Sequence, residues 1–257
     1  MREPHHPLTD HAFFCHRYFF PIDMMHLLEC KGVSGLVFGS VLLWLTRDSR
    51  LGGNRDERLA AINTLRLLHY RARPGEVVLP KIYLSNITRD GWGNLSGPAY
   101  KAAITRHAAP FFRELVCRYC VGTRATDVCM RSIVVALDDM YTLLYQAPMF
   151  LTDDQELRFR TLVLDFGRPY TRLRELSRRS GVFGFSVTPK VHKVQHLPLL
   201  ARCINPTRVQ VYSEESMMGV VTKTWRGSAR GRYKQHVQRI VLIKRLTGLL
   251  LRFELAL

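Results

Sequence analysis

The sequence predicts a mostly helical fold with a small β component. Apolar residues recur at helical spacing over long stretches, and several of these stretches open with helix-capping residues. Runs that alternate between apolar and polar residues, which are typical of strands, are few and short. Apolar residues make up 47% of the 257 residues, so the chain can bury a substantial hydrophobic core.

Two helices are expected in the first third of the chain. Residues 23–45 carry apolar side chains at helical spacing. The longest apolar stretch, residues 35–45, reaches about half of a bilayer span, so we expect a buried helix and no membrane span. Asn54 and Glu57 resemble a capping box, which predicts a second helix over residues 54–71.

An irregular link and then long helices are expected in the middle of the chain. Residues 74–97 are rich in Gly, Asn and Pro and contain one candidate strand at residues 81–84. Thr152 and Gln155 form a second candidate capping box. The predicted helices cover residues 98–119, 125–145 and 152–179.

Shorter elements are expected toward the C-terminus. Thr188 as the N-cap and Pro189 in the first turn predict a helix that stops near Asn205. A β-like run follows at residues 209–212, and an amphipathic helix with a basic face is expected at residues 233–251.

The formal net charge of +17 favours an acidic partner, and nucleic acid is the commonest one. Residues 190–252 contain 13 Lys or Arg and two acidic residues, and aromatic side chains lie among the cations. Such a surface can follow phosphates and stack on unpaired bases, although a solvated helix face can have the same composition. The candidate DNA contacts are Lys223, Arg226, Arg230, Arg232, Lys234 and Arg239.

The cysteines are expected to be reduced. Residues 1–10 are polar, with no apolar run after a basic start, which predicts that there is no secretory signal. The six cysteines then belong in a reducing compartment, and the Cys117–Cys120 pair in a predicted helix is interpreted as buried thiols.

Three groups of residues could carry chemistry. His192 and His196 are four residues apart on a predicted helix, a spacing that suits two metal ligands and equally two surface histidines. Glu215 follows a β-like run and could ligate Mg²⁺, or it is a first-turn glutamate favoured by the helix dipole. Asp23 could cap a helix in which His26 packs.

The order of these groups resembles that of one transposase family. Residues 21–33 resemble the D-x-M-H segment of CACTA (En/Spm-like) DDE transposases, and residues 39–43 are similar to the G-T-L-L that continues it. Residues 192–197 resemble the family's H-x-x-x-H-L. Residues 212–221 resemble its Y-P-F-E-R-Y-M segment, which aligns Glu215 with the last catalytic acid.

This resemblance implies a partial RNase H-like α/β core that is interrupted by a large helical insertion. Residues 1–45 would hold the end of the core with the DxxH helix, and residues 46–187 would be the insertion. Residues 188–257 would hold the HxxxH helix, the helix of the final Glu and the basic C-terminal helix.

The resemblance also implies a nuclear, DNA-binding fragment or relic of a cut-and-paste transposase, whose complete form cleaves DNA and transfers strands with Mg²⁺. Glu215 would be catalytic, Asp23 and His26 would support the active site, and His192 and His196 would hold zinc. Only 22 residues precede Asp23, and both catalytic Asp of the family are missing, so we expect no activity from the chain alone. Self-association is left open, and no membrane partner is expected.

Two other hypotheses stay open. A basic helical nucleic-acid-binding protein without transposase ancestry would depend on the cations of residues 223–239, but neither on Glu215 nor on the histidines. A peripheral membrane protein would use the amphipathic helix at residues 233–251 to bind anionic lipid.

Overall fold

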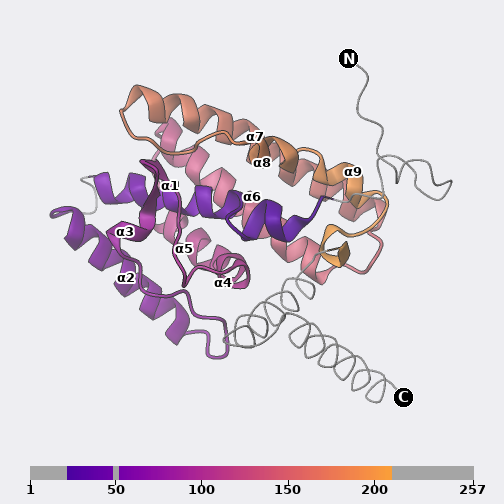
Figure 1. Cartoon of the computed structure of the whole chain (residues 1–257), viewed down its shortest axis with the longest axis horizontal. Coiled ribbons are helices and arrows are strands. Elements are labelled where there is room, and N and C mark those ends of the chain that lie inside the picture. Colours follow the sequence, from indigo (N-terminus) through magenta and orange to yellow (C-terminus); the bar gives the residue numbers. More distant parts are fainter. Residues whose placement is uncertain (1–21, 49–51, 210–257) are drawn as a thin grey trace, which may run out of the picture. The chain divides into compact units, whose positions relative to one another are not determined.

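A computed structural model of the chain describes residues 22–48 and 52–209 (Figure 1). These residues belong to one compact unit that extends to Gln210. Its elements in chain order are the π-helix η2 (Met25–Glu29), α1 (Val33–Arg47), α2 (Arg55–Arg71), α3 (Leu84–Ile87), β1 (Thr88–Arg89), β2 (Trp92–Gly93), α4 (Ala102–His107), α5 (Ala109–Tyr119), α6 (Ala125–Gln146), α7 (Asp153–Arg179), α8 (Pro189–Val194), α9 (Leu197–Ala201) and the 3-10 helix η4 (Pro206–Val209).

The prediction of a mostly helical fold with a small β component is confirmed. The antiparallel hairpin β1–β2 pairs Thr88 with Gly93 and is the only sheet in the described residues, which therefore show no RNase H-like sheet. One hydrophobic core runs through the unit from Met24 to Ala201. The division of the chain at residues 45 and 187 stays a prediction.

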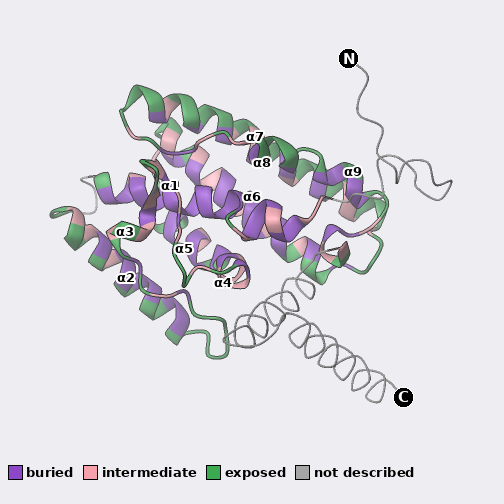
Figure 2. Cartoon of the chain, in the orientation of Figure 1, coloured by how far each residue is buried: buried purple, intermediate pink, exposed green. Residues whose placement is uncertain are grey.

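Helix α1 lies at the centre of the unit and is buried on nearly every side (Figure 2). It contacts η2, α2, α3, α4, α6 and both strands. The segment Met25–Arg47 is long and apolar enough to cross a membrane, but 83% of its most apolar part is buried inside the fold. An all-round apolar helix is expected in the core of a protein, so the predicted buried helix is confirmed.

The three buried hydroxyl groups of α1 all have hydrogen-bond partners inside the core. The Ser34 hydroxyl is hydrogen-bonded to the Tyr141 hydroxyl at 2.8 Å, and Thr46 donates to the Leu43 carbonyl at 3.2 Å. The Ser40 hydroxyl donates to the Gly93 carbonyl at 3.3 Å and accepts from the Phe185 amide at 2.7 Å. Burial of these hydroxyls therefore leaves no group without a partner, which is the condition for burying them at low cost.

Helices α6 and α7 form the largest helix–helix interface of the unit. The buried apolar and aromatic side chains of α7 are Phe159, Val163, Phe166, Tyr170 and Leu173, which alternate at spacings of four and three residues. This spacing makes one continuous apolar seam against α6. The side of α7 opposite this seam carries exposed residues (Figure 2).

Two helix starts follow their predicted capping boxes. The Asn54 side chain accepts from the amides of Asp56 and Glu57 at 2.9 and 3.0 Å, and Glu57 accepts from the Asn54 amide at 2.9 Å. Thr152 and Gln155 bond reciprocally in the same way at 3.3 and 3.0 Å. The helices predicted at residues 54–71, 125–145 and 152–179 are confirmed as α2, α6 and α7.

Three predicted helices are each divided in the structure. The continuous helix over residues 23–45 is wrong, because Lys31 has a φ of 49° and the chain turns between η2 and α1. Gly32 permits this turn, since a Cβ there would lie 2.4 Å from the Leu28 carbonyl carbon. Residues 98–119 contain α4 and α5, which meet at Ala108.

The helix predicted from Thr188 to Asn205 is also divided, into α8 and α9. Pro198 lies in the first turn of α9, where its missing N–H costs nothing, but it cannot continue α8. Thr188 is the N-cap residue of α8 by its backbone, yet its hydroxyl has no hydrogen-bond partner in the described residues.

The strand predicted at residues 81–84 is wrong. Residues 81–83 are irregular and α3 begins at Leu84, while the hairpin forms a few residues later. The β-like run beyond Val209 and the helix at residues 233–251 lie outside the described residues.

Two glycine substitutions test the close packing on α1. A Cβ on Gly39 would lie 2.3 Å from the backbone nitrogens of Asn94 and Leu95, so Gly39→Ala must displace the chain after the hairpin. We expect Gly39→Ala to lower the free energy of unfolding by about 1–3 kcal/mol in urea denaturation.

Gly167→Ala in α7 is the matched control, since its Cβ would make only an ordinary contact of 3.6 Å with the Gln195 amide nitrogen. This change should raise the free energy of unfolding by up to about 1 kcal/mol, because alanine favours the helix. Equal effects of the two substitutions would contradict the close approach at Gly39.

Candidate functional site

The predicted site residues divide into a described and an undescribed set. Asp23, His26, His192 and His196 lie in the described unit. Glu215 and the candidate DNA contacts Lys223, Arg226, Arg230, Arg232, Lys234 and Arg239 lie outside the described residues.

Asp23 and His26 form one hydrogen-bonded pair at the start of η2. The Asp23 carboxylate accepts from the Met25 amide at 3.0 Å, and its second oxygen accepts from His26 Nδ1. Asp23 thus caps the first turn and holds the imidazole, whose side chain is 43% exposed. The capping role predicted for Asp23 is confirmed, and His26 lies partly at the surface rather than packed in the core.

Lys190 at the start of α8 links the DxxH segment to the HxxxH segment. Its ammonium donates to the carbonyls of His26 at 2.7 Å and Lys31 at 3.1 Å. These carbonyls lie where the η2 turn ends, and a cation there is favoured by the backbone dipoles. Partial burial lowers the pKa of Lys190 below its ordinary value.

His192 and His196 meet on the exposed side of α8. Their Nε2 atoms are 3.2 Å apart, and the rings lie edge to face with centroids 4.9 Å apart. Two nitrogens bound to one tetrahedral zinc at 2.0–2.1 Å would be about 3.3 Å apart. The separation of the two Nε2 atoms therefore suits two of the four ligand positions around one zinc ion. The described residues contain no group of three His, Cys, Asp or Glu side chains that could hold a metal ion.

The described cysteines Cys30, Cys117, Cys120, Cys129 and Cys203 are free thiols. Of the Cys117–Cys120 pair, Cys120 is buried as predicted, whereas Cys117 is exposed. Burial is therefore wrong for Cys117, because the pair lies at the end of α5 and only one of its two positions faces the core.

A buried carboxyl group escaped the sequence analysis. Glu29, at the end of η2, has only 1% of its surface exposed. Its carboxylate accepts from the Tyr145 hydroxyl at 3.2 Å, and Arg106 Nη1 donates to the same hydroxyl at 2.6 Å. Burial raises the pKa of Glu29 to about 8, although Arg106 and the Tyr145 hydrogen bond oppose the change.

For Glu29 the sequence offers only helical spacing from an apolar neighbour, which does not reveal that the carboxyl group is buried. Glu29 lies four residues after Met25, a fully buried position, and therefore on the face of the turn that packs inward. Its neighbour Tyr141 is also buried, and this burial raises the pKa of the Tyr141 hydroxyl well above its ordinary value. The two titratable groups lie together in a region that strongly disfavours negative charge.

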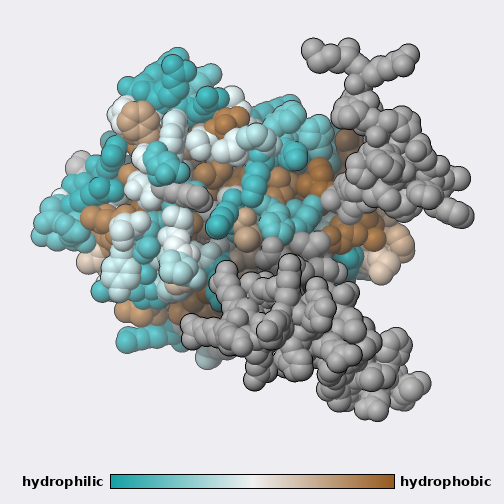
Figure 3. All heavy atoms as spheres, viewed as in Figure 1, coloured by the Kyte–Doolittle hydropathy of each residue, from teal (hydrophilic) through white to brown (hydrophobic). Residues whose placement is uncertain are grey.

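The outer side of α7 carries exposed arginines that the sequence analysis did not single out. Five arginines and one acidic residue occur in residues 168–179, and the acidic residue, Glu175, pairs with Arg172 at 3.0 Å. Hydrophilic residues cover this end of α7, at the upper left of Figure 3. The five exposed side chains, called here the arginine face, are Arg168, Arg172, Arg174, Arg178 and Arg179.

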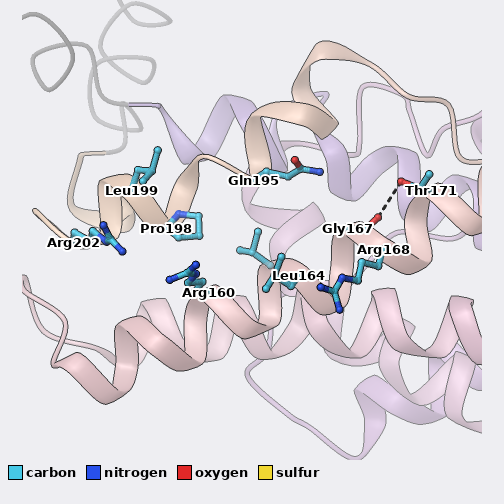
Figure 4. Close-up of a pocket in the computed structure, with 10 residues that line it drawn as sticks. Arg160, Leu164, Gly167, Arg168, Thr171, Gln195, Pro198, Leu199 and Arg202 are labelled. Atoms are coloured by element: carbon cyan, nitrogen blue, oxygen red, sulfur yellow. Dashed lines mark hydrogen bonds between the residues drawn. The ribbon is translucent and has the colours of Figure 1, made fainter.

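A groove of about 460 Å³ lies between α7 and the α8–α9 segment (Figure 4). Leu164 of α7 and Leu199 of α9 are apolar residues that line it. Arg160 and Arg202 lie toward one end, and Arg168 lies toward the other. The groove brings together residues that are about 40 positions apart and could not have been paired from helical spacing, which relates only near neighbours.

No protein-family model, curated protein or solved structure matches this chain. Functional inference therefore depends on the geometry and charge of the surfaces described above.

The buried Glu29 carboxyl should make stability pH-dependent. The pKa of Glu29 is about 8 in the fold, whereas its ordinary value is 4.5. As the pH rises, the unfolded chain therefore releases this proton at a lower pH than the folded chain does. The contribution of the protonated Glu29 to the free energy of unfolding is therefore fully present below about pH 4.5 and is lost as the pH rises toward 8. The loss is at most about 5 kcal/mol, at 1.36 kcal/mol per pH unit.

We expect Glu29→Gln to remove most of this decline, since a neutral amide cannot ionise. Urea denaturation across that pH range measures the difference between the variant and the parent protein. Glu175→Gln, on an exposed side chain, is the control and should leave the decline unchanged. Parallel pH profiles for the parent and Glu29→Gln would rule out an ionisation at Glu29.

Proposed function

We propose that this protein binds DNA and that it derives from the core of a CACTA-type DDE transposase. The observation that carries DNA binding is the arginine face of α7, in a chain with a formal net charge of +17. Phosphate groups are the ligands that such a row of exposed guanidinium groups fits best.

The arginine face has the length of a short stretch of nucleic-acid backbone. Arg168 and Arg179 are 11 positions apart on α7, which corresponds to about 16 Å along the helix axis. This length covers about five phosphates of one strand, at 3.4 Å each along the duplex axis. Because Glu175 pairs only with Arg172, the other four cations keep their charge for phosphate contacts.

Transposase descent is supported by how the resembling segments meet. The DxxH and HxxxH segments are separated by more than 160 residues, and Lys190 joins them through the His26 carbonyl at 2.7 Å. By the resemblance, Asp23 and His26 lie beside the active site and His192 and His196 hold zinc. The described helices of residues 46–187, from α2 to α7, would be the insertion in an RNase H-like core.

Under the same proposal Glu215 is a magnesium ligand, and magnesium supplies the charge stabilisation for phosphodiester chemistry in the complete enzyme. The cations of residues 223–239 also bind DNA, and the protein acts in the nucleus. Without transposase ancestry, the protein would still bind nucleic acid through its cations, and the histidines would have no role.

DNA binding is tested by the double substitution Arg178→Gln and Arg179→Gln. We expect weaker binding to duplex DNA and a salt slope, log Kobs against log salt, that is shallower by about 2. Fluorescence anisotropy over a range of salt concentrations measures both quantities.

Arg71→Gln with Lys101→Gln is the matched control, because both side chains are exposed and lie on α2 and before α4, away from α7. This pair should change the slope little. If the parent protein does not bind DNA, or if the two double substitutions weaken DNA binding equally, the arginine face is not the DNA contact.

The histidine pair is tested separately with zinc. We expect one zinc ion to bind to the two imidazoles. Isothermal titration calorimetry should find this binding lost in His192→Ala and in His196→Ala. Cys117→Ser should retain it, and zinc binding that survives both histidine variants would contradict the assignment.

A further inference from the structure

The groove between α7 and the α8–α9 segment combines an apolar centre with a cationic rim (Figure 4). Leu164 and Leu199 are 46% and 55% exposed, which is high for leucines that line a concavity. Exposed apolar side chains that lie together and are surrounded by polar ones mark interaction sites more often than isolated apolar residues do.

The rim is positively charged and largely uncompensated. Arg160 and Arg168 are two turns apart on α7 and make no ion pair with any described residue. Arg202 Nε donates to the Glu156 carboxylate at 2.8 Å. No acidic side chain is among the described residues that line the groove, so its field favours an anionic occupant.

The chemistry of the groove differs from that of a nucleic-acid site. Unpaired bases stack on aromatic side chains, and none of the described lining residues is aromatic. A duplex is convex and presents phosphates, which would leave the two leucines without apolar contacts. An occupant that fills the groove must supply apolar groups and negative charge together.

We propose that the groove binds an acidic amphipathic segment of a partner protein. Its apolar side chains contact Leu164 and Leu199, and its carboxylates pair with Arg160 and Arg168. A groove of about 460 Å³ holds a few side chains rather than a whole helix, so the segment lies over the groove and inserts its anchors. This site shares Arg168 with the arginine face proposed to bind DNA, and its other lining residues lie outside that face.

The probe is a labelled acidic peptide of about twelve residues, with leucines at i, i+3, i+4 and i+7 and glutamate or aspartate elsewhere. We expect saturable binding to the full chain in fluorescence anisotropy. Leu164→Asp and Leu199→Asp should each weaken it by about tenfold or more. Arg160→Glu should weaken it to a similar degree through charge reversal.

Matched controls use exposed residues of α7 outside the groove. Leu157→Asp changes a leucine that is 63% exposed, and Arg158→Glu reverses a neighbouring charge. Both should leave peptide binding within about twofold of the parent value. Unchanged thermal unfolding of the groove variants excludes misfolding as the cause of their effect.

Two results would overturn the proposal. One is equal binding of a peptide in which serine replaces every leucine, since that shows charge attraction alone. The other is a loss of duplex-DNA binding in Leu164→Asp and Leu199→Asp that matches the loss of peptide binding, because the groove would then belong to the nucleic-acid surface. A failure of DNA binding in the parent protein with intact peptide binding leaves the groove assignment supported.

Discussion

The all-round burial of α1 is the constraint on which the rest of the described structure depends. An apolar helix with no polar face must be enclosed by other elements. In this fold they are η2, which precedes α1 in the sequence, and several helices and the hairpin, which follow it. Gly39 and Gly93 let the hairpin backbone approach α1 closely, and the Ser40 hydroxyl ties both the hairpin and the Phe185 loop to it. Displacing α1 would therefore expose most of the core and leave buried hydroxyls without partners.

The enclosure of α1 also determines where the two histidine-bearing segments meet. The turn at Lys31 ends η2 and directs its last carbonyls outward, and Lys190 binds them. Protein groups alone therefore hold α8 against η2. The neighbouring His192 and His196 are pre-arranged at 3.2 Å, so a metal would bind to an existing pair rather than create it.

Helix α7 shows how one amphipathic helix can support two different surfaces. Its apolar seam packs on α6 and fixes its orientation. The solvent side is then divided along its length, with the groove around Leu164 and the arginine face from Arg168 onward. The first surface combines apolar and cationic groups and the second is almost wholly cationic, so the two favour partners of different chemistry.

The sequence by itself determined the helices that depend on local interactions. The capping boxes at Asn54 and Thr152 are contacts within a few residues, as are the Asp23–His26 and His192–His196 pairs. The apolar seam of α7 follows from the residue spacing of that helix alone. Only the tertiary structure decided the burial of Glu29 and the meeting of α7 with the α8–α9 segment, where Leu164 and Leu199 line one groove. Spacing rules relate residues on one element, whereas these features depend on neighbours from distant parts of the chain, as in the Lys190–His26 bond across 164 positions.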